Sequence, residues 1–141
     1  MKKIHTNILQ KASEAKNLRR NQIDLLRSRL NLLSGKDKVL MTMYLENGNS
    51  FRQIARLLGV TETRIARKVR GLTKRLIDGQ YIACLRYRNK FTIYQMTLAK
   101  DYFLTGLSMR KIADKRHRSR YHVRKTIKGI QSIIKLETRA M

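Results

Sequence analysis

Apolar residues in the first quarter of the chain follow an imperfect helical stripe from about Asn7 to Leu33. The spacing is close to 3.6 residues, which is typical of an α-helix, but the stripe leaves open whether the segment forms one helix or two. Packing on the next part of the chain and dimerisation both fit the pattern. The apolar positions are Ile8, Ala12, Leu18, Leu25, Leu26, Leu30 and Leu33.

Three helices are expected between residues 34 and 80. The first covers Lys36 to Glu46, and the second runs from Phe51 to Leu58 behind Ser50, whose hydroxyl suits an N-cap. Gly59 then tolerates the positive φ of a helix end, and Thr61 caps a third helix that runs to about Ile77. The predicted inner face of this third helix contains Ile65, Val69, Leu72 and Leu76.

The chain also overlays itself when it is shifted by 58 residues. The matches fall on turns, caps and apolar faces, so they predict two copies of one small unit. Two crossing helices need a small residue where they approach most closely, and Ala55 and Ala113 occupy that position. The sequence therefore predicts an all-α, mainly helical fold built as a tandem helix-turn-helix. The identical pairs are Leu40 with Leu98, Tyr44 with Tyr102, Gly48 with Gly106, Ser50 with Ser108, Arg52 with Arg110, Ile54 with Ile112, Ala55 with Ala113, and Gly71 with Gly129.

Residues 81–97, between the copies, allow two interpretations. Aromatic and β-branched runs flank the basic stretch Arg88-Asn89-Lys90, which favours a β-hairpin wing. The alternative is a helical linker whose aromatic residues join the core. The expected organisation is an N-terminal helical segment (1–33), a first helix-turn-helix (34–80), the wing or linker (81–97) and a second helix-turn-helix (98–141).

Charge narrows the function classes. The chain has 33 Lys and Arg against 9 Asp and Glu, a net charge of +24, and the cations are spread over the whole length. Such a charge repels itself unless a polyanion neutralises it, so nucleic acid is the expected partner. Without an 18-residue apolar run, a signal peptide or a second cysteine beside Cys84, we expect no membrane span, no intramolecular disulfide and a cytoplasmic, nucleoid-associated location.

The stretch from Ser50 to Thr61, followed by Arg64-Ile65 and by Lys74-Arg75-Leu76, resembles region four of bacterial sigma factors. It is also similar to the helix-turn-helix of response-regulator activators. The resemblance covers about residues 33–77 and implies promoter recognition by the second helix, with RNA polymerase as a further partner. It assigns base reading to Thr61, Glu62, Thr63, Arg64 and Arg67.

The chain departs from that family in two ways. It has no Trp and three Phe, so nothing matches the aromatic-rich sigma region that melts promoters, and a complete sigma factor is not expected. In the second copy, Arg116, His117 and Arg118 replace Leu58, Gly59 and Val60. Either that turn is more open, or the second copy favours phosphates over apolar packing.

We expect the first copy to read bases and the second to hold phosphates. Short polar groups at Thr61, Glu62 and Thr63 suit base edges, whereas a segment with nine Lys or Arg and one Asp, residues 110–128, suits the backbone. The predicted DNA-binding residues are Arg52, Thr61, Glu62, Thr63, Arg64, Arg67, Lys68, Arg70, Arg88, Lys90, Arg110, Arg118, Ser119, Arg120, Tyr121, Arg124, Lys125 and Lys128.

No enzyme chemistry is predicted. The histidines His5, His117 and His122 are too scattered for a metal site, and the acidic residues form no paired-carboxylate motif. We therefore expect no catalytic residue, metal or cofactor. The leading prediction is a sequence-specific duplex-DNA-binding transcription regulator of bacterial or phage type. The alternatives are an architectural, nucleoid-type DNA binder and an RNA-binding protein.

Overall fold

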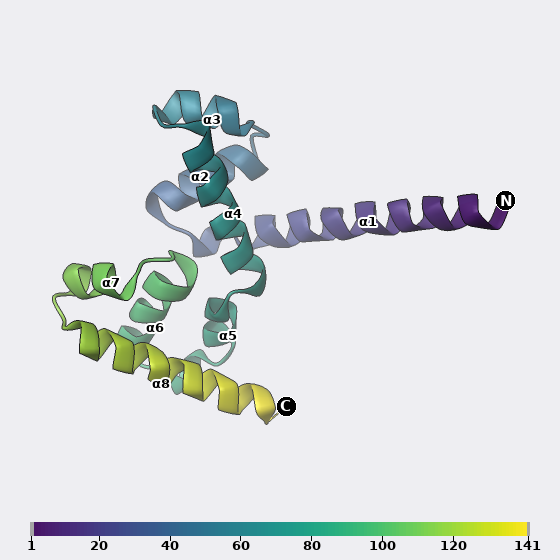
Figure 1. Ribbon diagram of the computed structural model, residues 1–141. Helices are drawn as coiled ribbons and strands as arrows, with labels where there is room; N and C mark the ends of the chain where they lie inside the picture. Colours follow the sequence, from purple (N-terminus) through teal and green to yellow (C-terminus); the bar gives the residue numbers. More distant parts are fainter. Residues whose placement is uncertain (1, 141) are drawn as a thin grey trace.

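The protein is all-helical, as predicted. The computed structural model describes the backbone of residues 2–140 and the side chains of residues 9–77 and 79–140, and no strand occurs in that part of the chain (Figure 1). Met1 and Met141, the outer ends of the expected segments, lie outside it. The elements are α1 (Lys2–Ser28), η1 (Leu30–Leu32), α2 (Gly35–Leu45), α3 (Phe51–Leu58), α4 (Glu62–Asp78), α5 (Gln80–Arg86), η2 (Arg88–Lys90), α6 (Ile93–Ala99), η3 (Lys100–Leu104), α7 (Met109–Arg116) and α8 (Arg120–Arg139).

The sequence repeat is also a structural repeat. α3 and α7 begin and end 58 residues apart, and α4 and α8 begin at the same offset. Both pairs start with equivalent caps, because the hydroxyls of Ser50 and Ser108 each accept a hydrogen bond from the backbone N–H three residues later, at 3.2 Å. Ala55 and Ala113 are both buried. The two copies therefore fold by the same local signals.

The repeat extends further toward the N-terminus than the sequence comparison suggested. The short 3₁₀ turns η1 and η2 are also 58 residues apart, and α5 is equivalent to the last turns of α1. At this level Leu26 and Cys84 are equivalent, and both are buried. Each copy thus consists of a preceding helix, a 3₁₀ turn and three further helical segments.

The predicted β-hairpin wing at residues 81–97 is wrong, because this segment is helical. Tyr81 and Cys84, three residues apart, are both buried, which is the period of a helix and not of a strand. Thr92 then starts α6 with a capping box, in which Gln95 N–H donates to the Thr92 hydroxyl at 3.1 Å and the Gln95 side chain accepts from Thr92 N–H at 2.9 Å. Tyr81, Phe91 and Tyr94 of this segment contribute to the core, as the linker alternative expected.

Two arginine side chains form long-range hydrogen bonds that involve α4. Arg75, near the end of α4, donates from Nε to the Leu104 carbonyl at 2.8 Å, in the second copy. Its guanidinium lies against Gly106, where an added Cβ would come within 2.6 Å of Cζ. Arg29 donates to the carbonyls of Leu76 and Ile77 at the end of α4. The Arg29 bonds satisfy orphan carbonyls at the end of α4 within the first copy, whereas the Arg75 bond joins the two copies.

Helix α1 projects away from the rest of the molecule (Figure 1). Its C-terminal end packs through Leu26, whereas the side chains from Leu9 to Asp24 are all exposed. Leu9 and Leu18 are nine residues apart, which is about two and a half helical turns, so they lie on opposite faces. Dimerisation, the other interpretation of this segment, stays a prediction. Within residues 2–140, no helix is both long enough and apolar enough to cross a membrane.

Candidate nucleic-acid interface

Helices α4 and α8 carry the largest group of predicted DNA-binding residues. Each helix buries one apolar face and leaves the opposite face exposed, because its apolar side chains recur every three or four residues. The buried faces are Ile65, Val69, Leu72 and Leu76 on α4, and Val123, Ile127, Ile130 and Ile134 on α8.

The outer face of α4 presents Thr63, Arg67 and Arg70. These three residues are exposed, and with Glu62 and Phe51 they line a shallow hollow of about 520 Å³ between the starts of α3 and α4. Thr61 lies just before this face as the N-cap, and its hydroxyl oxygen accepts a hydrogen bond from Arg64 N–H at 3.2 Å. Its hydroxyl proton remains available for a donor contact.

Arg64 and Lys68 lie on a different flank of α4. Both line a groove between α4 and α2, and Lys68 forms an ion pair with Asp37 of α2 at 3.4 Å. Arg67 borders both this groove and the hollow on the other side. The structure therefore brings Arg67 together with Thr63 and Arg70, but directs Arg64 toward α2.

The outer face of α8 presents Tyr121, Lys125 and Lys128, at positions equivalent to the three residues on α4. Tyr121 is 73% exposed, and both lysines are exposed as well. Arg124 lies beside them and is exposed. Arg120 occupies the first turn of α8, where α4 has Glu62, so this face of α8 has basic residues and Tyr121 but no acidic residue.

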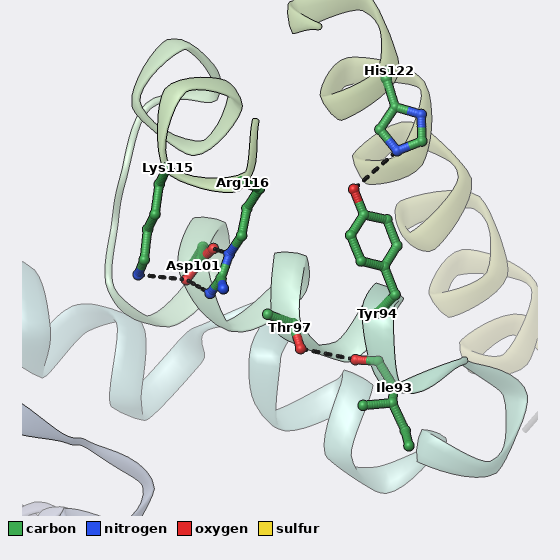
Figure 2. Close-up of polar contacts among 7 residues, drawn as sticks. All are labelled: Ile93, Tyr94, Thr97, Asp101, Lys115, Arg116 and His122. Carbon is green, nitrogen blue, oxygen red and sulfur yellow. Dashed lines mark hydrogen bonds and ion pairs between the residues drawn. The ribbon is translucent and has the colours of Figure 1, made fainter. Parts of the chain in front are cut away.

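A second flank of α8 is occupied by an aromatic contact. The Tyr94 hydroxyl on α6 lies 3.0 Å from His122 Nε2 (Figure 2). The Arg118 guanidinium lies 5.6 Å from the centre of the Tyr94 ring. The Ser119 hydroxyl caps the helix and accepts from His122 N–H at 3.1 Å. Arg118 and Ser119 thus reach the surface while they also hold the start of α8.

Of the two alternatives for the second turn, the structure does not support a more open backbone. Arg118 N–H donates to the Ala113 carbonyl at 3.0 Å, as Val60 N–H does to the Ala55 carbonyl in the first copy. His117 adopts a left-handed conformation, with φ of 55°, that matches Gly59 at 69°. The two turns therefore have the same backbone.

Arg116 is held by an acidic residue that sequence reasoning missed. Its Nε and Nη2 donate to the two carboxylate oxygens of Asp101 at 2.8 and 3.1 Å, and Lys115 Nζ lies 3.4 Å from the same group (Figure 2). Asp101 is 4% exposed, and its bonds raise the pKa of Arg116. The signal was present in the repeat, because Asp101 and Arg116 together replace Met43 and Leu58.

The remaining predicted residues lie on other helices than α4 and α8. Arg52 and Arg110 lie in the first turns of α3 and α7. Arg88 and Lys90 belong to η2, and Lys90 pairs with Glu137 at 3.7 Å, about 25 Å along α8 from its first turn. The structure thus does not bring η2 to the start of α8. All eighteen predicted side chains are exposed.

The described residues contain no group of three or more His, Cys, Asp and Glu that could hold a metal ion. The His5 side chain lies outside the described residues. Cys84 is buried, and burial raises the pKa of its thiol to about 11. No protein family, curated protein or solved structure matches this chain.

Proposed function

We propose that the protein binds duplex DNA through two helix-turn-helix units, α3–α4 and α7–α8, and regulates transcription. The observation that carries the proposal is the repeated arrangement of a capped helix, a left-handed turn and a second helix with an exposed cationic face. A helix of this kind fits the major groove of B-DNA and presents its outer residues to base edges. RNA polymerase and a location at the nucleoid belong to the same proposal.

The two units have different tasks in this proposal. Near the N-terminus of α4, Glu62 offsets the positive end of the helix dipole, and Thr63 is a short group suited to base edges. In α8 the equivalent positions are Arg120 and Tyr121. The positive N-terminal end of the helix and the Arg120 side chain therefore both attract phosphate. The first unit specifies the sequence and the second anchors the complex.

An architectural role is the second candidate. The observation that favours it is the outer face of α8. Lys125, Lys128 and Arg124 are exposed there, without a short polar side chain that could contact base edges. Phosphate contacts of this kind position a protein but carry no sequence information. If α4 contributes no discrimination, the same surface binds DNA of any sequence.

A salt titration of duplex DNA binding tests the proposal. Each neutralised phosphate contributes about −0.9 to the log–log slope, so about 6–10 contacts give a slope of about −5 to −9. Lys125→Ala/Lys128→Ala should flatten that slope by about two, because two phosphate contacts are lost.

The matched control is Lys11→Ala/Lys16→Ala on the projecting part of α1, which removes equal charge and should leave the slope unchanged. A nearly flat titration of the unmodified protein would refute duplex binding through these faces. Tighter binding of folded RNA than of duplex DNA at equal salt would favour an RNA partner instead.

A further inference from the structure

The groove between α2 and α4 exposes apolar side chains that the fold does not use. It has a volume of about 1070 Å³ and runs along α4 as far as Gly106. Val39 on one wall is 55% exposed, and Leu58 at the end of α3 is 47% exposed. Val60 and the edge of Leu40 complete the apolar floor. Apolar side chains that are exposed together and surrounded by polar residues are typical of interaction sites.

The second copy shows what a closed version of this groove looks like. Thr97 and Arg116 are equivalent to Val39 and Leu58, and Arg116 is bound to Asp101. Tyr94 lies where the first copy has Lys36, and its hydroxyl reaches His122, the equivalent of Arg64 (Figure 2). One fold therefore carries a groove that is filled and polar in one copy, and open and apolar in the other.

The rim of the open groove is strongly cationic. Lys36, Arg64, Arg67, Lys68 and Arg75 line it, with Asp37 as its acidic residue. Arg75 is bound to the Leu104 carbonyl and Lys68 to Asp37. Among the described residues, the side chains of Lys36, Arg64 and Arg67 line the groove without a hydrogen bond or ion pair. An occupant must therefore bring carboxylates to the rim and apolar side chains to the floor.

This chemistry excludes two occupants. A second copy of the chain carries 33 Lys and Arg against 9 acids, so its surface repels the rim. The phosphates of a nucleic acid suit the cationic rim. They gain nothing by covering Val39 and Leu58, because they would lose hydrating water there without a polar partner. An acidic protein segment satisfies both parts of the site.

The geometry also indicates the conformation of that segment. No strand edge exists among residues 2–140, so the groove offers no ladder of backbone groups for an added strand. Two helices form its walls, and the stretch of α4 from Arg64 to Arg75 is about 16 Å long, which matches about three turns of a helix. A helix that lays its apolar face into a groove is a common mode of peptide recognition.

We propose that the α2–α4 groove of the first copy binds an acidic amphipathic helix of a partner protein. Apolar residues of that helix contact Val39 and Leu58, and its carboxylates pair with Lys36 and Arg64. The site does not depend on DNA binding, although Arg64 and Arg67 belong to both proposed surfaces. A bound acidic helix therefore competes with DNA for these two arginines.

Fluorescence anisotropy without DNA tests the groove with a synthetic helical peptide of about 14 residues. Its leucines follow i, i+3, i+4 and i+7 spacing, and its other positions are mainly glutamate. A second peptide has the same composition with the leucines spread around the helix. We expect the amphipathic peptide to bind about tenfold more tightly than its shuffled isomer, because only the first can bury its leucines.

The double variant Val39→Thr/Leu58→Gln should remove that preference. The control Leu136→Gln, at a side chain 67% exposed on α8 outside the groove, should keep it. Circular dichroism checks that the variants fold. Equal affinity of the two peptides for the unmodified protein, or an undiminished preference in the double variant, would refute the proposal.

A photoreactive leucine analogue in the amphipathic peptide gives an independent measurement on the unmodified protein. Cross-links mapped by mass spectrometry should fall in residues 35–40 and 57–60. Cross-links confined to α8 or α1 would overturn the assignment to this groove, whatever the affinity.

Discussion

The two copies share one backbone but hold their helices together with different chemistry. In the second copy, Asp101 and Arg116 form a bidentate ion pair. In the first copy, the equivalent positions hold Met43, which packs against the core, and Leu58, which is largely exposed. The turns that precede α3 and α7 nevertheless have matching hydrogen bonds. Asn49 N–H donates to the Met43 carbonyl, and Leu107 N–H donates to the Asp101 carbonyl, both at 3.0 Å.

This comparison shows that the caps and the left-handed turn define the unit, whereas the contacts around them can change. Gly59 adopts positive φ without penalty, while His117 adopts it with a Cβ, at a steric cost. The substitution of Arg116 for Leu58 made the second copy resemble an open, phosphate-binding turn. A buried carboxylate instead keeps it closed.

Removing that carboxylate should have the largest effect on stability. Asp101→Ala leaves Arg116 without its partner beneath the turn, and loss of one member of a buried pair costs several kcal/mol. Because the Arg116 side chain is 31% exposed and can be partly hydrated, we expect about 3 kcal/mol of destabilisation, at the lower end of that range. Urea unfolding followed by circular dichroism measures it.

The double variant Asp101→Met/Arg116→Leu is the matched control, because it places the residues of the first copy in the second. Replacing a buried ion pair by apolar residues is often neutral, so it should recover most of the lost stability. If Asp101→Ala unfolds at the same urea concentration as the unmodified protein, the ion pair is not what holds this turn.

The second prediction compares the outer faces of α4 and α8 on DNA. An arginine that donates two hydrogen bonds to guanine contributes about 1–3 kcal/mol of discrimination, so Arg67→Ala should narrow the gap between a selected site and random duplex. Lys125→Ala at the equivalent position should weaken both by similar factors, because phosphate contacts do not depend on sequence. Binding isotherms for both DNAs provide the measurement.

Two other results are informative. If Lys125→Ala removes discrimination instead, the reading and anchoring tasks are reversed between the copies. If neither substitution alters the gap, the architectural alternative describes the protein better than specific recognition does.

The sequence predicted the helices and the repeat because local signals determine them. Ser50 and Ser108 cap their helices, Gly59 ends one, and the apolar spacing of α4 and α8 shows which face is buried. Of the two interpretations of residues 81–97, the β-hairpin wing is wrong. Aromatic and β-branched residues are common both in strands and in buried helices, whereas the capping box of Thr92 and Gln95 indicates a helix.

Long-range contacts were beyond such signals. The Asp101–Arg116 pair joins residues 15 apart, and the bond from Arg75 to the Leu104 carbonyl spans 29 positions between the copies. Neither contact joins residues at a regular helical spacing, so neither can be recognised from the sequence. For the candidate site, periodicity placed Arg67 and Lys125 on exposed faces, but it did not show that Arg64 turns toward α2, where a groove opens.

The smallest expected effect concerns the paired glycines inside α4 and α8. Gly129 is exposed, and a Cβ added there meets no atom within 4 Å, so Gly129→Ala should stabilise the protein by about 0.5–1 kcal/mol through reduced backbone entropy of the unfolded chain. At Gly71, the same Cβ would lie 3.1 Å from Arg75 Nη1. Since Arg75 is hydrogen-bonded to the Leu104 carbonyl, Gly71→Ala should increase the free energy of unfolding by less than Gly129→Ala, or not at all. Unfolding midpoints of the two variants, measured side by side, decide this. A larger gain at Gly71 would mean that the Arg75 bonds do not constrain the junction between the copies.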